Sequence, residues 1–356
     1  MTIDRADALD DALDRLDSYH YLVMPGPFAC HGPMGAETLS TLGYNHLVGT
    51  WVEEYKSRHQ PLGPFATVER IDPADRRSWQ AALGDITRVS DWAALFHAEL
   101  TDDAWPAVVR RWLPWLLPGC AGGLTHGLIR VAHAVRALTG DSKPSQLLLA
   151  ELAKALALWA GAFTLLPGRP LLQGPLTLEE AISKLPRPKD PWLPIEAGTF
   201  ARIHELEEFP SVVEALRPPD LADQALSDLS IRSCQVMLNN PALDLIPLVH
   251  TLTPIAAVRI LQPHIPLIPT EIIYAQLWHV NAGILCGFTP AQTPPEATNS
   301  DRNEPPPLSE IIAQAVEHQD PHVLKFTEAC AREYALRPDP TFLLAAQTLL
   351  KQTPAW

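Results

Sequence analysis

Apolar residues recur at spacings of three and four along most of this chain, which is the period of helices that bury one face. Alternating runs of β-branched residues, which would indicate half-buried strands, are scarce. The pattern therefore predicts an all-α fold. The predicted helices cover residues 3–19, 35–42, 46–57, 79–83, 91–100, 104–115, 124–138, 145–165, 177–184, 200–206, 210–216, 221–239, 242–262, 272–287, 308–318 and 320–336.

The connections between these helices are rich in proline. The chain has 36 prolines, and many of them lie in residues 167–194 and 290–307. Because proline interrupts helices, both stretches are expected to be long loops, and residues 289–307 are expected to form a mobile loop or lid. No internal repeat is visible, so a solenoid is not favoured. The length allows one large domain or two closely packed ones, and we expect a single large multi-helix domain over residues 1–356.

The composition is that of a globular protein with a large core. Of the 356 residues, 47% are hydrophobic and 19% are charged. The formal net charge of -14 disfavours a nucleic-acid partner, because nucleic-acid-binding proteins use lysine and arginine to displace counterions from phosphates. The apolar run at residues 147–166 contains Glu151 and Lys154, so a buried helix is expected there and no membrane span.

The cysteines and the N-terminal segment bear on the compartment. Five cysteines lie far apart without any Cys-x-x-Cys motif, so neither a disulfide framework nor a zinc ribbon is expected. Residues 2–16 are acidic and amphipathic, and they lack the basic start and apolar stretch of a signal peptide. We therefore expect a cytoplasmic protein.

One predicted helix places a lysine where a core residue is expected. Asp320 followed by Pro321 is a helix start, since the carboxylate can accept backbone N–H groups and proline loses no hydrogen bond at the first helical position. His322 and Lys325 then share one face of this helix, which continues as an apolar stripe.

Two interpretations of Lys325 remain open. The side chain extends to water or forms an ion pair, with Glu328 and Glu317 as available partners. Alternatively, it is enclosed as a neutral amine, because burial lowers the pKa of lysine. A neutral lysine can add carbon dioxide and become a carbamate, which is an anionic oxygen ligand suited to a metal ion beside neutral imidazoles.

Four histidines stand in apolar surroundings far apart in the sequence: His31, His126, His250 and His322. Any one of them is explained by a hydrogen-bonded core imidazole. Together with a carboxylated Lys325 they form a coordination sphere suited to iron, with ligands drawn from several helices. Motifs that mark other kinds of enzyme site do not occur, since the sequence has no Glu-x-x-His, His-Glu-x-x-His, His-x-His, Gly-x-Gly-x-x-Gly, P-loop or Gly-x-Ser-x-Gly motif.

Several of these segments, in this order, resemble the questin oxidase-like family. They are residues 28–34 (FACHGPM), 125–130 (THGLIR), 250–253 (HTLT), 256–259 (AAVR), 277–278 (LW) and 320–325 (DPHVLK), which span nearly the whole chain. The chain departs from the family pattern at Cys30, where asparagine is usual, and at Pro321, where an acidic residue is common. It also lacks the histidine cluster that follows the first motif in fungal relatives.

The resemblance implies an all-helical oxygenase that cleaves rings of aromatic polyketides such as anthraquinones, by Baeyer–Villiger-like or dioxygenase chemistry. It implies non-haem iron(II), dioxygen and a small aromatic substrate, with NADPH as an external reductant. The implied metal ligands are His31, His126, His250, His322 and carboxylated Lys325. His133 and His279 are candidates to replace a ligand or to act as acid–base groups near the metal.

Two rival functions stay open. One is a non-catalytic helical protein that binds a hydrophobic aromatic ligand, with histidines that only donate or accept hydrogen bonds. The other is a zinc-dependent hydrolase. Aromatic residues that either wall a substrate pocket or simply pack in the core are Trp112, Trp115, Trp159, Trp278 and Phe288.

Overall fold

The computed structural model describes residues 3–26, 28–63, 65–139, 143–188, 200, 202–290 and 304–356. It confirms the predicted fold class, since the described chain is predominantly α-helical and has three short strands. Its internal contacts divide it into two compact units. Unit 1 consists of Met1–Leu165 and Ala257–Pro266, and unit 2 of Leu166–Ala256 and Leu267–Trp356. The expected single domain over residues 1–356 stays a prediction.

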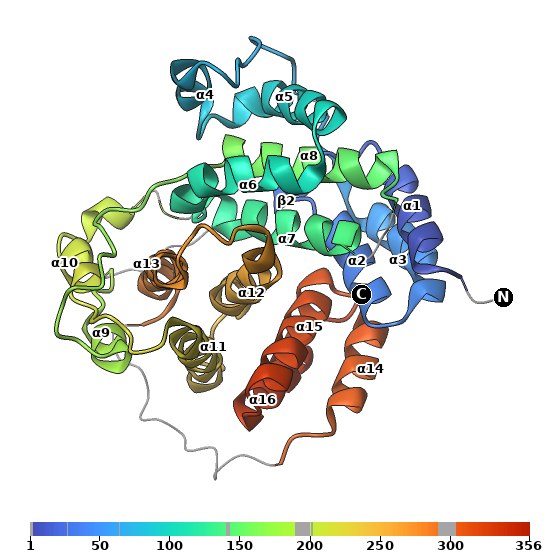
Figure 1. Cartoon of the computed structure of the whole chain (residues 1–356). Coiled ribbons are helices and arrows are strands. Elements are labelled where there is room, and N and C mark those ends of the chain that lie inside the picture. The colour runs from blue at the N-terminus through green and yellow to red at the C-terminus, as the bar shows by residue number, and fades with distance from the viewer. Residues whose placement is uncertain are drawn as a thin grey trace. The chain divides into compact units, whose positions relative to one another are not determined.

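Unit 1 is organised around the helix α8, which packs against both α5 and α7 (Figure 1). Its helices are α1 (Arg5–Arg15), α2 (Gly32–Thr41), α3 (Asn45–Arg58), α4 (Arg76–Ala82), α5 (Val89–Asp102), α6 (Trp105–Leu116), α7 (His126–Thr139) and α8 (Gln146–Gly161). Between Glu151 and Ala160 every residue of α8 except Lys154 is buried, as expected for the apolar run. The charge of Glu151 is held by a bidentate ion pair with Arg130 of α7.

A small antiparallel sheet in unit 1 leads the chain into α2. Its strands are β1 (Leu22–Met24), β2 (Phe28–Ala29) and β3 (Gln60–Pro61), and β1 lies in the middle. The sheet was not predicted, because each strand is too short to show an alternating pattern. It matters for function because β2 ends two residues before His31.

Unit 2 contains the C-terminal helices, of which α14, α15 and α16 pack on one another (Figure 1). Its helices are α9 (Leu178–Lys184), α10 (Phe209–Glu214), α11 (Ala222–Asn239), α12 (Ile246–Leu261), α13 (Thr270–Phe288), α14 (Leu308–His318), α15 (Pro321–Leu336) and α16 (Pro340–Gln352). The helix α12 has its residues up to Ala256 in unit 2 and the remainder in unit 1.

Several predicted boundaries need correction. The helix predicted to begin at residue 124 begins at His126, because the residues before it have left-handed backbone. Of the helix predicted over 200–206, the described residues form only the 3-10 turn Ile203–Glu205. The helix α16 was not predicted at all. Of the predicted lid at 289–307, residues 291–303 lie outside the described residues.

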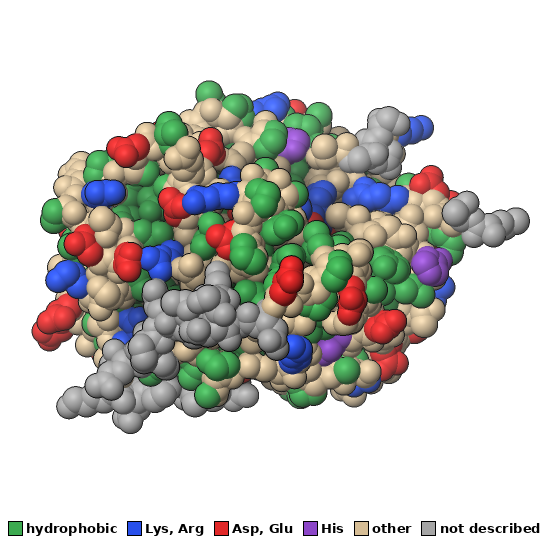
Figure 2. Space-filling model, turned by 90° about the horizontal axis from the view of Figure 1, so that it is seen from below, with side chains coloured by type: hydrophobic (Ala, Val, Ile, Leu, Met, Phe, Trp, Pro, Cys, Tyr) green, Lys and Arg blue, Asp and Glu red, His purple; other side chains and the backbone are tan. Residues whose placement is uncertain are grey.

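Two further observations bear on partners. Among the described helices none is long and apolar enough to cross a membrane. On the face shown in Figure 2, acidic and basic side chains are interspersed with small hydrophobic groups. Several surface arginines lie in ion pairs; Arg15, for example, pairs with Asp11 and Glu53.

Candidate functional site

His31 is held at the start of α2, where it is the N-cap residue. Its backbone N–H donates to the Tyr55 hydroxyl at 2.9 Å, and its Nδ1 lies 2.7 Å from the carbonyl oxygen of Ala29. A carbonyl can only accept, so in the neutral ring the hydrogen is on Nδ1 and Nε2 presents a lone pair. This is the usual arrangement of a metal-binding histidine whose other nitrogen is fixed by the backbone.

The turn Gly122–Thr125, which precedes α7, sets the orientation of His126. Gly123, Leu124 and Thr125 all have positive φ, at 55°, 52° and 67°. Two of these three residues carry side chains, which makes the left-handed conformation unfavourable unless the surroundings hold it. Backbone strain of this kind concentrates at functional sites.

Glycines allow α8 and the residues after it to hold this turn. A Cβ on Gly122 would lie 1.7 Å from the carbonyl oxygen of Ala162, and a Cβ on Gly127 would lie 2.5 Å from Cα of Trp159. Only glycine permits such a close approach of backbones. The segment Gly-Gly-Leu-Thr-His-Gly therefore fixes the start of α7 against the end of α8, with His126 in between.

His126 meets His31 through the Nε2 atoms. Nδ1 of His126 lies 2.6 Å from the carbonyl oxygen of Gly123, so this ring also carries its hydrogen on Nδ1 when neutral. The two Nε2 atoms are 3.0 Å apart, the rings are nearly perpendicular at 81°, and both side chains are buried. Two nitrogen lone pairs at this distance repel each other unless a positive species lies beside them. The geometry of the two Nε2 atoms therefore suits binding of a metal ion or sharing of a proton.

Further along the same two helices, Glu37 of α2 meets His133 of α7. His133 Nδ1 lies 2.7 Å from Glu37 Oε2, and Arg136 donates to both carboxylate oxygens. Burial alone would favour the protonated acid, but the charge of Arg136 and the hydrogen bonds from His133 and Arg136 hold the pKa of Glu37 far below its ordinary range. His133 shares a helix with His126, as predicted, but its orientation is set by a carboxylate.

Glu37 was not singled out from the sequence. The signal was present, because Glu37 is the only charged residue between Gly32 and Thr41, in a helix that is otherwise apolar or small. A lone carboxylate on a buried helix requires a cationic or hydrogen-bonding partner.

In unit 2, His322 and His250 lie near each other. His322 is in the first turn of α15, and its ring centroid is 6.2 Å from that of His250 on α12, with the rings at 78°. Asp320 caps α15 through the N–H groups of His322 and Val323, and its Oδ1 is 3.4 Å from His322 Nδ1. Burial opposes the charge of Asp320, but these hydrogen bonds outweigh it and lower the pKa of the carboxyl. A carboxylate that fixes an imidazole is a common support for a metal ligand.

The helix α12 lacks one backbone hydrogen bond at His250, although it is continuous from Ile246 to Leu261. Pro254 has no N–H group to donate to the carbonyl of His250, four residues earlier. The next carbonyl, that of Thr251, accepts hydrogen bonds from Ser233 and Asn281, on α11 and α13. These polar contacts hold the buried His250 at a fixed place within unit 2.

Lys325 is 2% exposed. The interpretation that its ammonium extends to water is therefore wrong, and the expected placement of a lysine on the buried face of α15 is confirmed. Of the two proposed ion-pair partners, Glu328 also accepts hydrogen bonds from Arg332, at 2.6 and 3.2 Å to its two oxygens. The ion-pair interpretation of Lys325 stays a prediction. Carboxylation of Lys325 stays a prediction.

His279 on α13 is placed differently from the other candidates. Its Nε2 lies 2.8 Å from the carbonyl oxygen of Pro167, and its ring stacks on Phe209. Burial lowers the pKa of this imidazole, so the neutral ring donates from Nε2. These contacts fit a packed core residue, and a role for His279 in acid–base chemistry stays a prediction.

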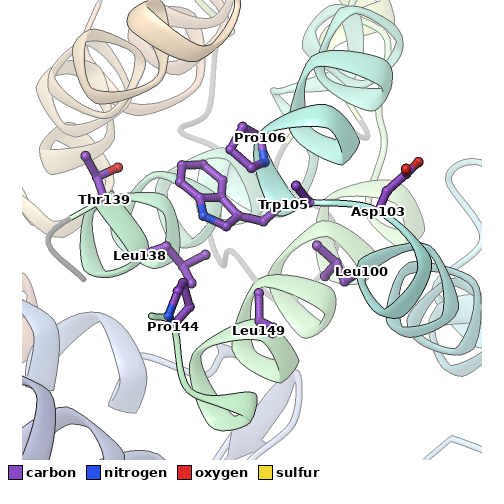
Figure 3. A pocket seen from close by; sticks show the side chains of 9 residues that line it. Leu100, Asp103, Trp105, Pro106, Leu138, Thr139, Pro144 and Leu149 are labelled. Carbon is purple, nitrogen blue, oxygen red and sulfur yellow. The ribbon is translucent and has the colours of Figure 1, made fainter. Parts of the chain in front are cut away.

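Three cavities of unit 1 are lined by residues other than His31 and His126. The largest of the three, about 710 Å³, lies over α5 and the segment 67–73, and a second of about 430 Å³ is lined by Leu100, Trp105, Leu138 and Leu149. In Figure 3 the Trp105 indole lies among the apolar side chains of this second cavity, and the Asp103 carboxylate points away from it. The third, about 20 Å³, is lined by His133, Glu37 and Glu151 and has the size of one water molecule.

Comparison with known proteins gives no match for this chain: no family model matches it, and no curated protein is similar enough to count as a relative. The resemblance to the questin oxidase-like family stays a prediction. What the structure brings together is His31 with His126 in unit 1, and His250 with His322 in unit 2.

Proposed function

We propose that the chain is a non-haem iron-dependent oxygenase of aromatic, polyketide-like phenols or quinones. In this proposal His31, His126, His250 and His322 bind the iron together with a carboxylated Lys325. The observation that carries it is the buried pair of Nε2 atoms in unit 1, both with lone pairs and 3.0 Å apart.

The separation of the two Nε2 atoms agrees with binding to one ion. Two nitrogen ligands about 2.1 Å from a metal and at a right angle are about 3.0 Å apart, whereas in a tetrahedral zinc site they are about 3.3 Å apart. The distance of 3.0 Å in this pair is therefore close enough for both nitrogen atoms to bind one transition-metal ion, and in this proposal that ion is iron.

Unit 2 offers the other donors that the proposal needs. The carboxylate of Asp320 lies beside His322 Nδ1, which favours a lone pair on Nε2 of that ring. Lys325 is enclosed on the same helix face. In this proposal it is a neutral amine, the form that burial favours and that can accept carbon dioxide. The carbamate would then be the one anionic ligand among neutral imidazoles.

Bound iron(II) would supply the activation of dioxygen for ring opening, by Baeyer–Villiger-like or dioxygenase chemistry, with NADPH as a possible external reductant. The chain's own residues hold the imidazoles in one tautomer through Ala29 and Gly123, keep bulk water away from them by burial, and fix their spacing through α2 and α7. Pre-organisation of this kind lowers the cost of ordering ligands when the metal binds.

Metal content and oxygen uptake test the proposal. The full chain is loaded with iron(II) under argon, desalted and measured for iron, and oxygen consumption is then followed with 1,8-dihydroxyanthraquinone. We expect stoichiometric iron and substrate-dependent oxygen uptake. Stoichiometric zinc and turnover without oxygen would favour the hydrolase, and a metal-free protein that binds the quinone unchanged would favour the binding protein.

Lys325→Ala tests the ligand set. Loss of an anionic ligand should remove most of the bound iron. The partly exposed Lys154, which pairs with the exposed Asp17, provides the control. Lys154→Ala should keep its iron and change the free energy of unfolding by at most about 1 kcal/mol. Wild-type iron content in Lys325→Ala would refute the role of Lys325.

A further inference from the structure

The indole of Trp159 differs from those of Trp92 and Trp278 in its hydrogen bonding. The N–H of Trp92 donates to the carbonyl of Ala82 at 3.0 Å, and that of Trp278 donates to the carbonyl of Val213 at 3.2 Å. Trp159 is equally buried, at 1% exposure, but its Nε1 has no hydrogen-bond partner among the described atoms.

A buried donor without a partner is costly and uncommon. Phenylalanine would fill the same place in the core without this cost, so packing alone does not explain the indole N–H. A buried unpaired donor in a native protein calls for an explanation, such as local strain, a functional role, or an ion or water molecule that accepts its hydrogen bond.

Trp159 lies beside the residues that position His126. It stands on the side of α8 that faces α7, and its Cα and Cβ are in the closest contact that Gly127 allows. Gly127 follows His126 directly, and the strained residues Leu124 and Thr125 precede it. Strained backbone and an unpaired buried donor are independent observations, and both lie at the start of α7.

We propose that Nε1 of Trp159 donates a hydrogen bond to an oxygen atom of the bound aromatic substrate, a quinone carbonyl or a phenolate. This inference rests on the proposed function, which gives the class of substrate. The indole would distinguish oxygenated rings from plain hydrocarbons of the same shape, because only the former offer an acceptor.

Two soluble probes of matched shape test this inference. Anthraquinone-2-sulfonate carries two carbonyl oxygens, and anthracene-2-sulfonate has the same ring system without them. Their affinities for the full chain are measured under argon by titration calorimetry, for the wild type and for Trp159→Phe. We expect Trp159→Phe to weaken the affinity for anthraquinone-2-sulfonate about five- to tenfold and to leave the affinity for anthracene-2-sulfonate unchanged.

Trp92→Phe is the matched control, because it removes an indole N–H that has a partner in the protein. It should lower the melting temperature and leave both affinities unchanged, whereas Trp159→Phe should melt at or above the wild-type temperature without ligand. Equal affinities of wild type and Trp159→Phe for anthraquinone-2-sulfonate, or an equal loss for both probes, would overturn the inference while leaving the proposed function intact. A wild-type chain that binds neither probe would overturn the substrate class itself.

Discussion

The buried carboxylate of Glu37 accepts hydrogen bonds from several helices of unit 1. The substitution Glu37→Gln tests what this carboxylate contributes to the free energy of unfolding. The Glu37 side chain is 4% exposed and receives hydrogen bonds from His133, Arg136, Arg5 and Thr41. These donors come from α1, α2 and α7, so one carboxylate joins three helices. Glutamine has nearly the same shape, and the substitution therefore changes charge and hydrogen bonding with little change in packing.

The expected loss of stability is large. A glutamine side chain keeps one oxygen and places an NH₂ group against donors that require an acceptor. The guanidinium of Arg136, which is itself mostly enclosed, would lose its anionic partner. Breaking a buried ion pair by removing one member costs about 3–5 kcal/mol, so we expect a decrease of this size in the free energy of unfolding at pH 7, measured by urea denaturation.

The pH dependence gives a second measurement. The pKa of Glu37 is lowered in the folded protein, so its contribution is fully present above the ordinary carboxyl value and is lost as pH falls toward the folded value. The stability difference between the wild type and Glu37→Gln should therefore narrow as pH falls from about 4.3 downward.

The exposed Glu53, which pairs with Arg15 and Lys56, provides the control. Glu53→Gln should cost at most about 1 kcal/mol. If Glu37→Gln costs no more than Glu53→Gln, or if its effect does not change with pH, then Glu37 does not hold the three helices as described.

Two further substitutions test the surroundings of the histidine pair. Tyr55→Phe removes the acceptor of the His31 backbone N–H, so it should lower the free energy of unfolding by about 1–3 kcal/mol and weaken iron binding. Tyr19→Phe is the control, because the Tyr19 hydroxyl donates to the carbonyls of Lys56 and His59, and it should leave iron affinity unchanged. Gly127→Ala forces a Cβ against the α8 backbone and should lower stability by about 1–3 kcal/mol. Gly161→Ala, where a Cβ meets ordinary contacts at 3.4 Å or more, should cost nothing; equal costs for both glycines would contradict the packing at α7.

The fold class could be predicted because helical periodicity is repeated many times along the chain, so errors at single boundaries do not matter. Local signals are less dependable than this repeated pattern. Asp320-Pro321 predicts a helix start, and the carboxylate does cap α15. Asp339-Pro340 is the same dipeptide, and Asp339 caps α16 through the N–H of Thr341, yet this helix was not predicted.

The start of α7 could not be read from periodicity. Leu124 and Thr125 fit a helical pattern of apolar and polar residues, but their left-handed backbone is imposed by contacts of Gly122 and Gly127 with the distant α8 segment. A sequence shows that a glycine is present and does not show which backbone approaches it. The pairing of Glu37 with His133 is hidden for the same reason, since 96 residues separate them.

In the proposed site, charge balance would make Lys325 matter more than any single histidine. Four neutral imidazoles bring no negative charge to a buried dication, and a buried charge without a counter-charge is strongly disfavoured. Asp320 lies next to His322, but its Oδ1 is already bound to two N–H groups of α15 and serves the helix as a cap. A carbamate on Lys325 would place an anion on the same helix face as His322. In the proposed site, loss of one imidazole would remove one of several similar ligands. Loss of Lys325 would remove the only anion, on which the metal affinity of the four neutral imidazoles would depend.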